Sequence, residues 1–231
     1  MQHNYEHPEL LVETQWLEDH LGDEGLRIVD CDSPDAYRRV HIPGSVNVGE
    51  NSNVKGEDGV HVMQPEPLAL FMGNLGITSD TLVVAYDSRN SLQAARFWWV
   101  LNYYGHTNVK VLNGGWRKWL YEGRPVTEGI PNITPTTFAP RPDPSLLVTG
   151  EELRSLVGES GPVIWDVRSE AEHTGENIRS NKYGGHIPGA VSMEWNSVVD
   201  DNKFGAFKPA SEIRSMLESK GITPEKETYA Y

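Results

Sequence analysis

Short apolar runs alternate with amphipathic stretches along most of this chain. Residues 82–86, LVVAY, are rich in β-branched and aromatic side chains, which predicts a buried strand. A polar loop from Asp87 to Ser91 follows, and residues 92–104 carry apolar side chains at nearly helical spacing before Gly105. A strand, a tight loop and a helix in this order direct backbone N–H groups toward one point, so Asp87 faces a predicted anion-binding loop.

The same alternation predicts elements on both sides of this stretch. Strands are predicted at residues 26–31, 45–48 and 109–112, and helices at 35–39, 65–75 and from the Gly-Gly-Trp sequence at 114–116 to about residue 121. Because the strands are apolar throughout and alternate with helices, we expect an α/β fold. Each parallel sheet should be covered by helices on both faces.

The order of these elements occurs twice along the chain, as an internal repeat. Residues 76–78, Gly-Ile-Thr, recur at 221–223, and residues 41–44, His-Ile-Pro-Gly, recur at 186–189, in both cases 145 positions later. A repeat of this length with a matching order of elements predicts a duplicated α/β domain rather than a solenoid.

The two copies differ in one insertion and at their ends. The strand that ends at Asp30 recurs 136 positions later at Asp166, so the second copy gains nine residues, within the polar segment 172–185. Tyr86 recurs as Tyr231, and the counterpart of Asp87 would be the next residue. We expect the native chain to continue, because a sheet without its last strand and covering helices would expose on the order of several hundred Å² of apolar surface at about 25 cal/mol per Å².

Proline marks the boundary between the copies. Residues 131–144 contain five prolines and no apolar periodicity, which predicts an extended linker. We therefore predict an N-terminal domain over residues 1–130, a linker over 131–147, and a C-terminal domain over 148–231 that stops just before the counterpart of the loop that begins at Asp87.

Composition excludes several classes of function. The net charge of −13 argues against a nucleic-acid partner, since phosphate binding needs clustered Lys and Arg. No apolar run approaches the roughly 18 residues that span a membrane, and the first residues do not resemble a secretory signal. The single cysteine, Cys31, excludes an internal disulfide and favours a cytoplasmic location. No spacing of His, Cys and acidic residues predicts a metal site, and no cofactor is expected.

Several separated motifs resemble the rhodanese family. They are the two His-Ile-Pro-Gly turns, each after an Asp-bearing strand, and the LNGGW sequence at residues 112–116 followed by Trp119. The resemblance covers nearly the whole chain and implies a tandem-domain sulfurtransferase acting on thiosulfate or 3-mercaptopyruvate. In such proteins the first domain is catalytically silent, often with Asp at the nucleophile position, as with Asp87 here. The resemblance implies that one loop of this silent first domain corresponds to the active-site loop of the second. Its residues are Asp87, Ser88, Arg89, Asn90 and Ser91.

The resemblance places a nucleophilic cysteine directly after Tyr231. This cysteine would take a sulfane sulfur from a small anionic donor as a persulfide, and pass it to cyanide or a thiol. Arg179 and Lys182 lie in the insert where family members bind the donor, so we predict that they bind it here. Glu172 stands where mercaptopyruvate enzymes have an arginine, which favours a thiosulfate-type donor.

Two other functions stay open on the sequence alone. One is a non-catalytic binding or regulatory module that uses the anion-binding loop without chemistry, and the other is a related Cys-loop phosphatase with a longer loop. The identity of the residue after Tyr231 and the length of its loop distinguish these functions. A cysteine with a loop of six residues favours the sulfurtransferase, a longer loop favours the phosphatase, and any other residue favours the binding module. At Asp87 a carboxylate would accept the loop's N–H groups but is a poor nucleophile toward sulfur, so a structural role is expected. We expect Cys31 to be a buried inert thiol, and His41 and His186 to stabilise their turns.

Overall fold

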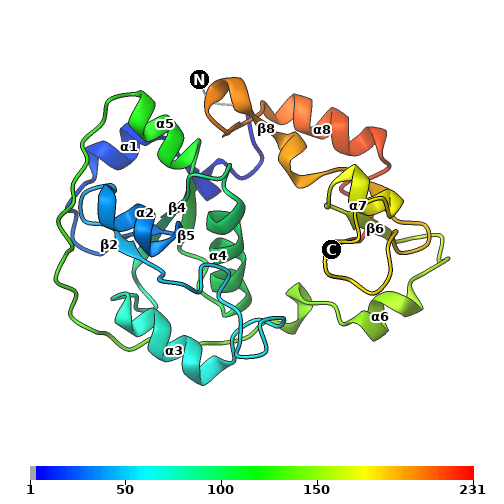
Figure 1. The fold of residues 1–231 in the computed structure, drawn as a ribbon, viewed down its shortest axis with the longest axis horizontal. Helices are drawn as coiled ribbons and strands as arrows, with labels where there is room; N and C mark the ends of the chain where they lie inside the picture. Colours follow the sequence, from blue (N-terminus) through cyan, green and yellow to red (C-terminus); the bar gives the residue numbers. More distant parts are fainter. Residues whose placement is uncertain (1–3) are drawn as a thin grey trace. The chain divides into compact units, whose positions relative to one another are not determined.

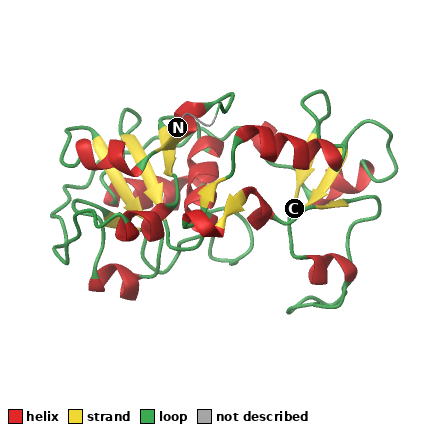
Figure 2. Ribbon diagram, turned by 90° about the horizontal axis from the view of Figure 1, so that it is seen from above, coloured by secondary structure: helices red, strands yellow, loops and turns green. Residues whose placement is uncertain are grey.

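A computed structural model describes residues 4–231 of the chain (Figure 1). The chain divides into two compact units. The N-terminal unit comprises His7–Leu146 and Asp200–Phe207, and the C-terminal unit comprises Met1–Glu6, Leu147–Val199 and Lys208–Tyr231. Both units contain a parallel sheet with helices around it (Figure 2), which confirms the predicted α/β class with a repeated sheet.

The N-terminal unit is built on a five-stranded sheet in the order β1-β5-β4-β2-β3, with all neighbours parallel. Its strands are β1 (Leu11–Val12), β2 (Leu26–Asp30), β3 (Val46–Asn47), β4 (Leu82–Tyr86) and β5 (Val109–Leu112). Its helices are α1 (Thr14–Asp19), α2 (Pro34–Arg39), α3 (Pro65–Asn74), α4 (Leu92–Tyr103) and α5 (Gly115–Tyr121), and η1 (Pro8–Leu10) and η2 (Pro144–Leu146) are short 3₁₀ turns.

The side chains of strand β4 contact helices on both faces of this sheet. Successive side chains of a strand point to opposite faces. Val83 and Ala85 therefore join the buried cluster that includes Leu68 of α3 and Phe97 of α4. Val84 and Tyr86 join a second cluster, which holds Leu17 of α1 and Trp119 of α5. The central strands are buried on both sides, as their continuous apolar sequence predicts.

The Pro-rich segment is extended and lies along the N-terminal unit. Phe138 is buried in the cluster beneath α3 and α4. The Thr136 N–H donates to the Gly73 carbonyl at 2.9 Å, and the Arg141 N–H donates to the Tyr104 carbonyl at 2.9 Å. These contacts fix residues 136–141 on the N-terminal unit. The predicted domain limits at residues 130 and 148 stay a prediction.

The C-terminal unit repeats part of this plan. Its sheet has the order β10-β6-β7, the counterpart of β4-β2-β3, and its neighbours are parallel. The strands are β6 (Val163–Asp166), β7 (Val191–Ser192) and β10 (Thr228–Ala230), and the helices are α6 (Gly150–Ser155), α7 (Glu170–Thr174) and α8 (Ala210–Ser219). The unit also contains η3 (Trp195–Val198), which leads into β8 (Val199–Asp200). Strand β8 pairs with β9 (Ala206–Phe207), and β9 and η4 (Asp201–Lys203) belong to the segment Asp200–Phe207 of the N-terminal unit.

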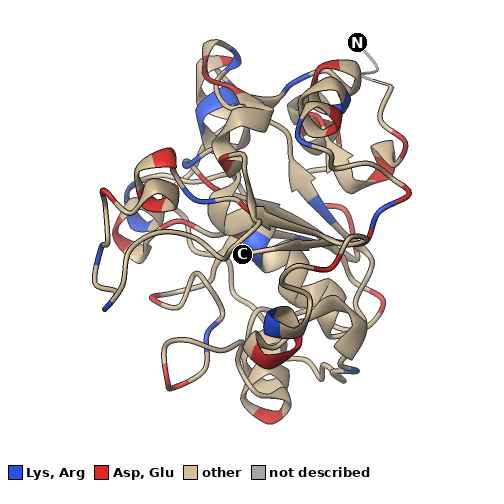
Figure 3. Cartoon of the chain, turned by 90° about the vertical axis from the view of Figure 1, so that its right-hand side faces the viewer, with Lys and Arg blue, Asp and Glu red and all other residues tan. Residues whose placement is uncertain are grey.

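Charged residues of both signs are interspersed along the helices and loops (Figure 3). The excess of 33 acidic over 20 basic residues is thus the ordinary surface charge of a folded protein rather than a single charged tract. Within residues 4–231, no helix has the length and apolar character needed to cross a membrane.

Candidate functional site

The loop after β4 holds its own carboxylate where an anion would bind. The Asp87 Oδ1 atom accepts the backbone N–H groups of Arg89 at 2.8 Å and Ser91 at 2.9 Å, and Oδ2 accepts that of Ala94 at 2.8 Å. Asp87 is 1% exposed, and burial raises its pKa despite the three hydrogen bonds. The ring of N–H donors predicted from the strand, loop and helix is present, and Asp87 fills it.

The rest of the inactive loop makes contacts within the N-terminal unit. Ser88 Oγ donates to Asp32 Oδ1 at 2.9 Å. Asn90 and Ser91 both have positive φ, 58° and 67°, which turns the chain sharply before α4. Asn90 Nδ2 donates to Asp201 Oδ1 at 3.1 Å, so residues from the segment Asp200–Phe207 contact this loop. Arg89 is exposed.

Tyr86, the last residue of β4, is held in place by hydrogen bonds to β2 and to the first His-Ile-Pro-Gly turn. Its hydroxyl donates to Asp30 Oδ2 at 2.6 Å and accepts the Ile42 N–H at 3.3 Å. Its carbonyl accepts the Cys31 N–H at 2.9 Å. These bonds fix the point at which the chain leaves the sheet and enters the loop of Asp87.

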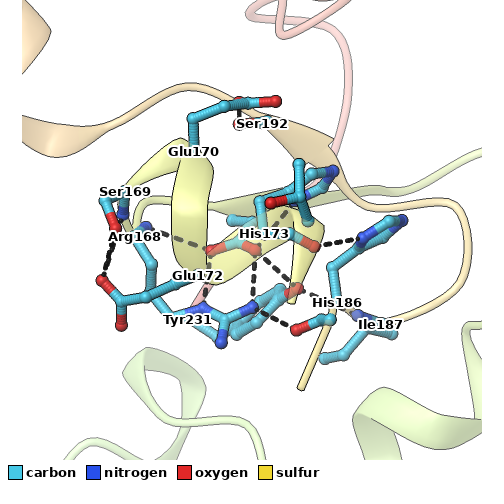
Figure 4. Close-up of polar contacts among 12 residues, drawn as sticks. Arg168, Ser169, Glu170, Glu172, His173, His186, Ile187, Ser192 and Tyr231 are labelled. Carbon is cyan, nitrogen blue, oxygen red and sulfur yellow. Dashed lines mark hydrogen bonds and ion pairs between the residues drawn. The ribbon is translucent and has the colours of Figure 1, made fainter. Parts of the chain in front are cut away.

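Tyr231 repeats this arrangement in the C-terminal unit (Figure 4). Its hydroxyl donates to Asp166 Oδ2 at 3.1 Å and accepts the Ile187 N–H at 3.0 Å. Its carbonyl accepts the Val167 N–H at 3.1 Å. Each of these three hydrogen-bond partners is the repeat counterpart of a partner of Tyr86. Tyr231 thus holds the same place in its sheet as Tyr86 does in the first copy.

The two copies differ in the charges around the paired aspartates. Arg168 stands at the position of Asp32 and donates to Asp166 from Nε at 2.9 Å and from Nη2 at 2.7 Å. His173 stands at the position of Tyr37, with Nδ1 2.9 Å from Asp166 Oδ2. Burial opposes ionisation of the Asp166 carboxyl, but Arg168 and His173 hold its pKa well below the usual range.

The aspartate of the first copy has the opposite environment. Burial raises the pKa of Asp30 to about 6, and the neighbouring Asp32 adds to the increase. The first copy thus gathers Asp30, Asp32 and Asp87 at the carboxyl end of its sheet, all buried. The second copy instead surrounds Asp166 with a cationic side chain, Arg168, and a protonatable one, His173.

The histidines of the two turns have matching structural roles. His41 Nδ1 lies 2.7 Å from the Tyr37 carbonyl, and the two rings stack with centroids 3.8 Å apart. His186 Nδ1 lies 2.8 Å from the His173 carbonyl, and these rings stack at 3.7 Å. Both histidines therefore anchor their turns to the preceding helix, as we expected from the sequence.

The structure places the two predicted donor-binding residues in the insert of the C-terminal unit. Arg179 Nε lies 2.7 Å from Glu172 Oε1, so the guanidinium forms an ion pair with this carboxylate. Glu172 also accepts the Ser169 hydroxyl at 2.8 Å, in a capping box that begins α7. Lys182 is exposed, with Nζ 5.2 Å from the centre of the Tyr183 ring.

Sequence reasoning missed Arg168 and His173. Both could have been found from the offset of 136 positions that relates Asp30 to Asp166, because the same offset places them opposite Asp32 and Tyr37. Their pairing with Asp166 is local, because Arg168 lies in the turn directly after β6 and His173 lies on α7, which follows that turn.

The remaining candidates for chemistry carry little reactivity. Cys31 is fully buried, and burial raises the pKa of its thiol well above the usual range, which disfavours the nucleophilic thiolate. Within the described part of the chain, no group of three or more His, Cys, Asp or Glu residues could hold a metal ion.

Comparison with known proteins agrees with this arrangement. Residues 13–122 match the model of the rhodanese-like domain. Sulfur carrier protein TtuD of Thermus thermophilus is 35% identical over 239 residues, covering 98% of this chain and 83% of that protein. Thiosulfate sulfurtransferase of Azotobacter vinelandii is 34% identical over 222 residues, covering 94% of this chain and 80% of that protein.

A solved structure extends the likeness to the whole fold. The crystal structure of SseA from Escherichia coli, described as a 3-mercaptopyruvate sulfotransferase with the rhodanese fold, has a TM-score of 0.81 and 25% identity to this chain. It covers 96% of this chain and 87% of its own. With the duplicated sheet and the matching surroundings of Tyr86 and Tyr231, these similarities show that the chain belongs to the rhodanese family.

Proposed function

We propose that this protein is a sulfurtransferase that moves a sulfane sulfur from thiosulfate, or from 3-mercaptopyruvate, to cyanide or a thiol acceptor. The nucleophile in this proposal is a cysteine directly after Tyr231. The observation that carries the proposal is the match between Tyr231 and Tyr86, which have equivalent partners at equivalent atoms. The names of the relatives, a sulfur carrier and a thiosulfate sulfurtransferase, support the same chemistry.

The geometry of the first copy explains why a cysteine at this point would react. Two oxygens of Asp87 accept three backbone N–H groups. A thiolate in an equivalent ring would be stabilised in the same way, which lowers its pKa and keeps it ionised near neutral pH. The thiolate would attack the outer sulfur of thiosulfate, and sulfite would leave with the electron pair of the S–S bond. Cyanide would then attack the outer sulfur of the persulfide, giving thiocyanate and restoring the thiolate.

The charges of the C-terminal unit suit an anionic donor. Arg168 replaces an acidic residue of the first copy, and in our proposal Arg179 and Lys182 attract and bind the donor from the insert. Arg179 is 65% exposed at its side chain although it pairs with Glu172, so part of its guanidinium can still reach a ligand. The presence of Glu172 in place of an arginine favours thiosulfate over 3-mercaptopyruvate.

A thiocyanate assay on the complete gene product tests this proposal. We expect thiocyanate to form from cyanide with thiosulfate, and more slowly with 3-mercaptopyruvate. Cys31→Ala should retain this activity, because the Cys31 thiol is fully buried and its burial raises its pKa, which disfavours a reactive thiolate. Absence of thiocyanate with both donors would refute the transferase. If the protein nevertheless retained a sulfur atom, the result would indicate a sulfur carrier.

The same assay tests the donor-binding residue. Arg179→Gln should raise the KM for thiosulfate about tenfold with little change in kcat, as expected when a binding interaction of about 1.4 kcal/mol is removed. Arg154→Gln is the matched control, because Arg154 is an exposed arginine on α6 of the same unit. Equal effects of the two substitutions would remove Arg179 from the site.

A further inference from the structure

Arg27 occupies a strand position that is held by an apolar residue in the second copy of the repeat. It is the second residue of β2, a strand that lies between β4 and β3. Alternation along the strand places Arg27 on the same face as Val29 and Cys31, which are fully buried beneath α3 and α4. Its counterpart in the second copy, 136 positions later, is Val163, which is 8% exposed. The first copy therefore carries a guanidinium where the second carries an aliphatic side chain.

This guanidinium has no acceptor in the described part of the chain, residues 4–231. No hydrogen bond or ion pair involves its side chain there, and its Nε atom is buried without a partner. Burial lowers the pKa of Arg27, and no neighbouring charge contributes to the change. An unpaired buried donor on a charged group is costly, whereas an arginine normally presents its five N–H donors to acceptors.

The guanidinium of Arg27 lies next to Gly76 and Ile133. A Cβ atom added to Gly76 would lie 2.7 Å from Arg27 Nη2 and 2.9 Å from Ile133 Cγ2. Gly76 also has a φ of +71°, a conformation that favours glycine. The guanidinium thus packs between the turn after α3 and the Pro-rich segment.

Arg27 lines a cavity of about 560 Å³ within the N-terminal unit. The walls come from the loop before β2, from the turn at Pro43 and Gly44, and from residues 131–136. Asn132 and Thr134 on the wall carry polar side chains with no hydrogen bond to other described residues, so they can bind a ligand's remaining oxygens. The acidic residues at 23 and 24 also line the cavity and disfavour a doubly charged anion.

We propose that this cavity binds a small monocarboxylate, whose two oxygens pair with the fork of the Arg27 guanidinium. A planar carboxylate matches the guanidinium geometry, and the two acidic side chains in the wall repel its single charge less than they would repel a doubly charged anion. The site involves only the N-terminal unit, so it is independent of the proposed sulfur chemistry.

NMR of the arginine Nε–H groups tests this proposal on the full protein. We expect one signal to shift saturably when acetate or propionate is added at constant ionic strength, and Arg27→Met should remove that signal. The carboxylates should also raise the Tm of the unaltered protein but not that of Arg27→Met. The variant should be at least as stable as the parent without ligand, because it loses no partner.

Parallel titrations with phosphate and sulfate distinguish the ligand class. Absence of a saturable shift with acetate and propionate would overturn the proposal, and so would a response to phosphate or sulfate alone. If Arg27→Met does not fold, Arg27→Val provides the second variant, because valine is the residue of the other copy. The titration of the unaltered protein decides the question in either case.

Discussion

Asp166→Asn should lower the free energy of unfolding by about 3 kcal/mol at pH 7, as measured by urea denaturation of the protein. The substitution removes the buried carboxylate that pairs with Arg168 and accepts hydrogen bonds from His173 and Tyr231. The Arg168 guanidinium would remain without its anionic partner, and breaking one side of a buried ion pair is strongly destabilising. The Asp166 side chain is 0% exposed, so solvent cannot replace the lost contacts.

The effect should depend on pH in a defined direction. The pKa of Asp166 is lower in the folded protein than in the unfolded chain, so its stabilisation is present above the ordinary aspartate pKa of about 4 and is lost as the pH falls below it. The difference between the parent and Asp166→Asn should therefore stay constant from pH 7 to about 5 and shrink as the pH falls below about 4.

Asp30→Asn is the matched control, and we expect the opposite effect on the free energy of unfolding. The pKa of Asp30 is raised to about 6 in the folded protein, so its ionisation weakens the fold as the pH rises from about 4 through 6. Replacement with asparagine removes this penalty and should leave the protein equally stable or more stable at pH 7, by at most about 3 kcal/mol. Destabilisation of similar size by both substitutions at pH 7 would contradict the charge contrast between the copies.

Gly115→Ala should destabilise the N-terminal unit by about 3 kcal/mol, measured by the same denaturation. A Cβ atom at this position would lie 2.2 Å from the Asp87 carbonyl oxygen, and Gly115 has a φ of +52°. The carbonyl cannot easily move away, because it accepts the Trp116 N–H at 2.9 Å. Overpacking of about 1–3 kcal/mol adds to the strain of a left-handed alanine, about 1–2 kcal/mol.

Gly123→Ala separates these two contributions. Gly123 has a φ of +67°, but an added Cβ would meet nothing within 4 Å. This variant should therefore lose only about 1 kcal/mol from backbone strain. If Gly115→Ala were no more destabilising than Gly123→Ala, the result would contradict a close contact between residue 115 of α5 and the Asp87 carbonyl.

Local patterns in the sequence predicted most of the elements that carry the site. The predicted strand at 82–86 coincides with β4, and the helices predicted at 65–75 and 92–104 differ from α3 and α4 by one residue at the end. These elements have clear apolar periodicity and end at turn residues, so neighbouring residues determine them. The duplication could also be predicted from the sequence, because identical short segments recur at a constant offset.

The charge networks could not be predicted in the same way. The ion pair of Arg179 with Glu172 and the contact of Asn90 with Asp201 depend on how separate segments pack, and the second joins residues 111 positions apart. Arg27 interrupts an apolar strand, and its lack of a partner becomes visible only in three dimensions. Such contacts leave no periodic signal in the sequence.

The most direct test of the account is the intact mass of the complete gene product after incubation with thiosulfate, followed by peptide mapping. We predict a gain of one sulfur atom on a cysteine directly after Tyr231, which added cyanide should remove and prior alkylation of that cysteine should prevent. A different residue at that position, or a protein whose mass is unchanged by the donor, would contradict the proposal that the second copy carries the sulfur.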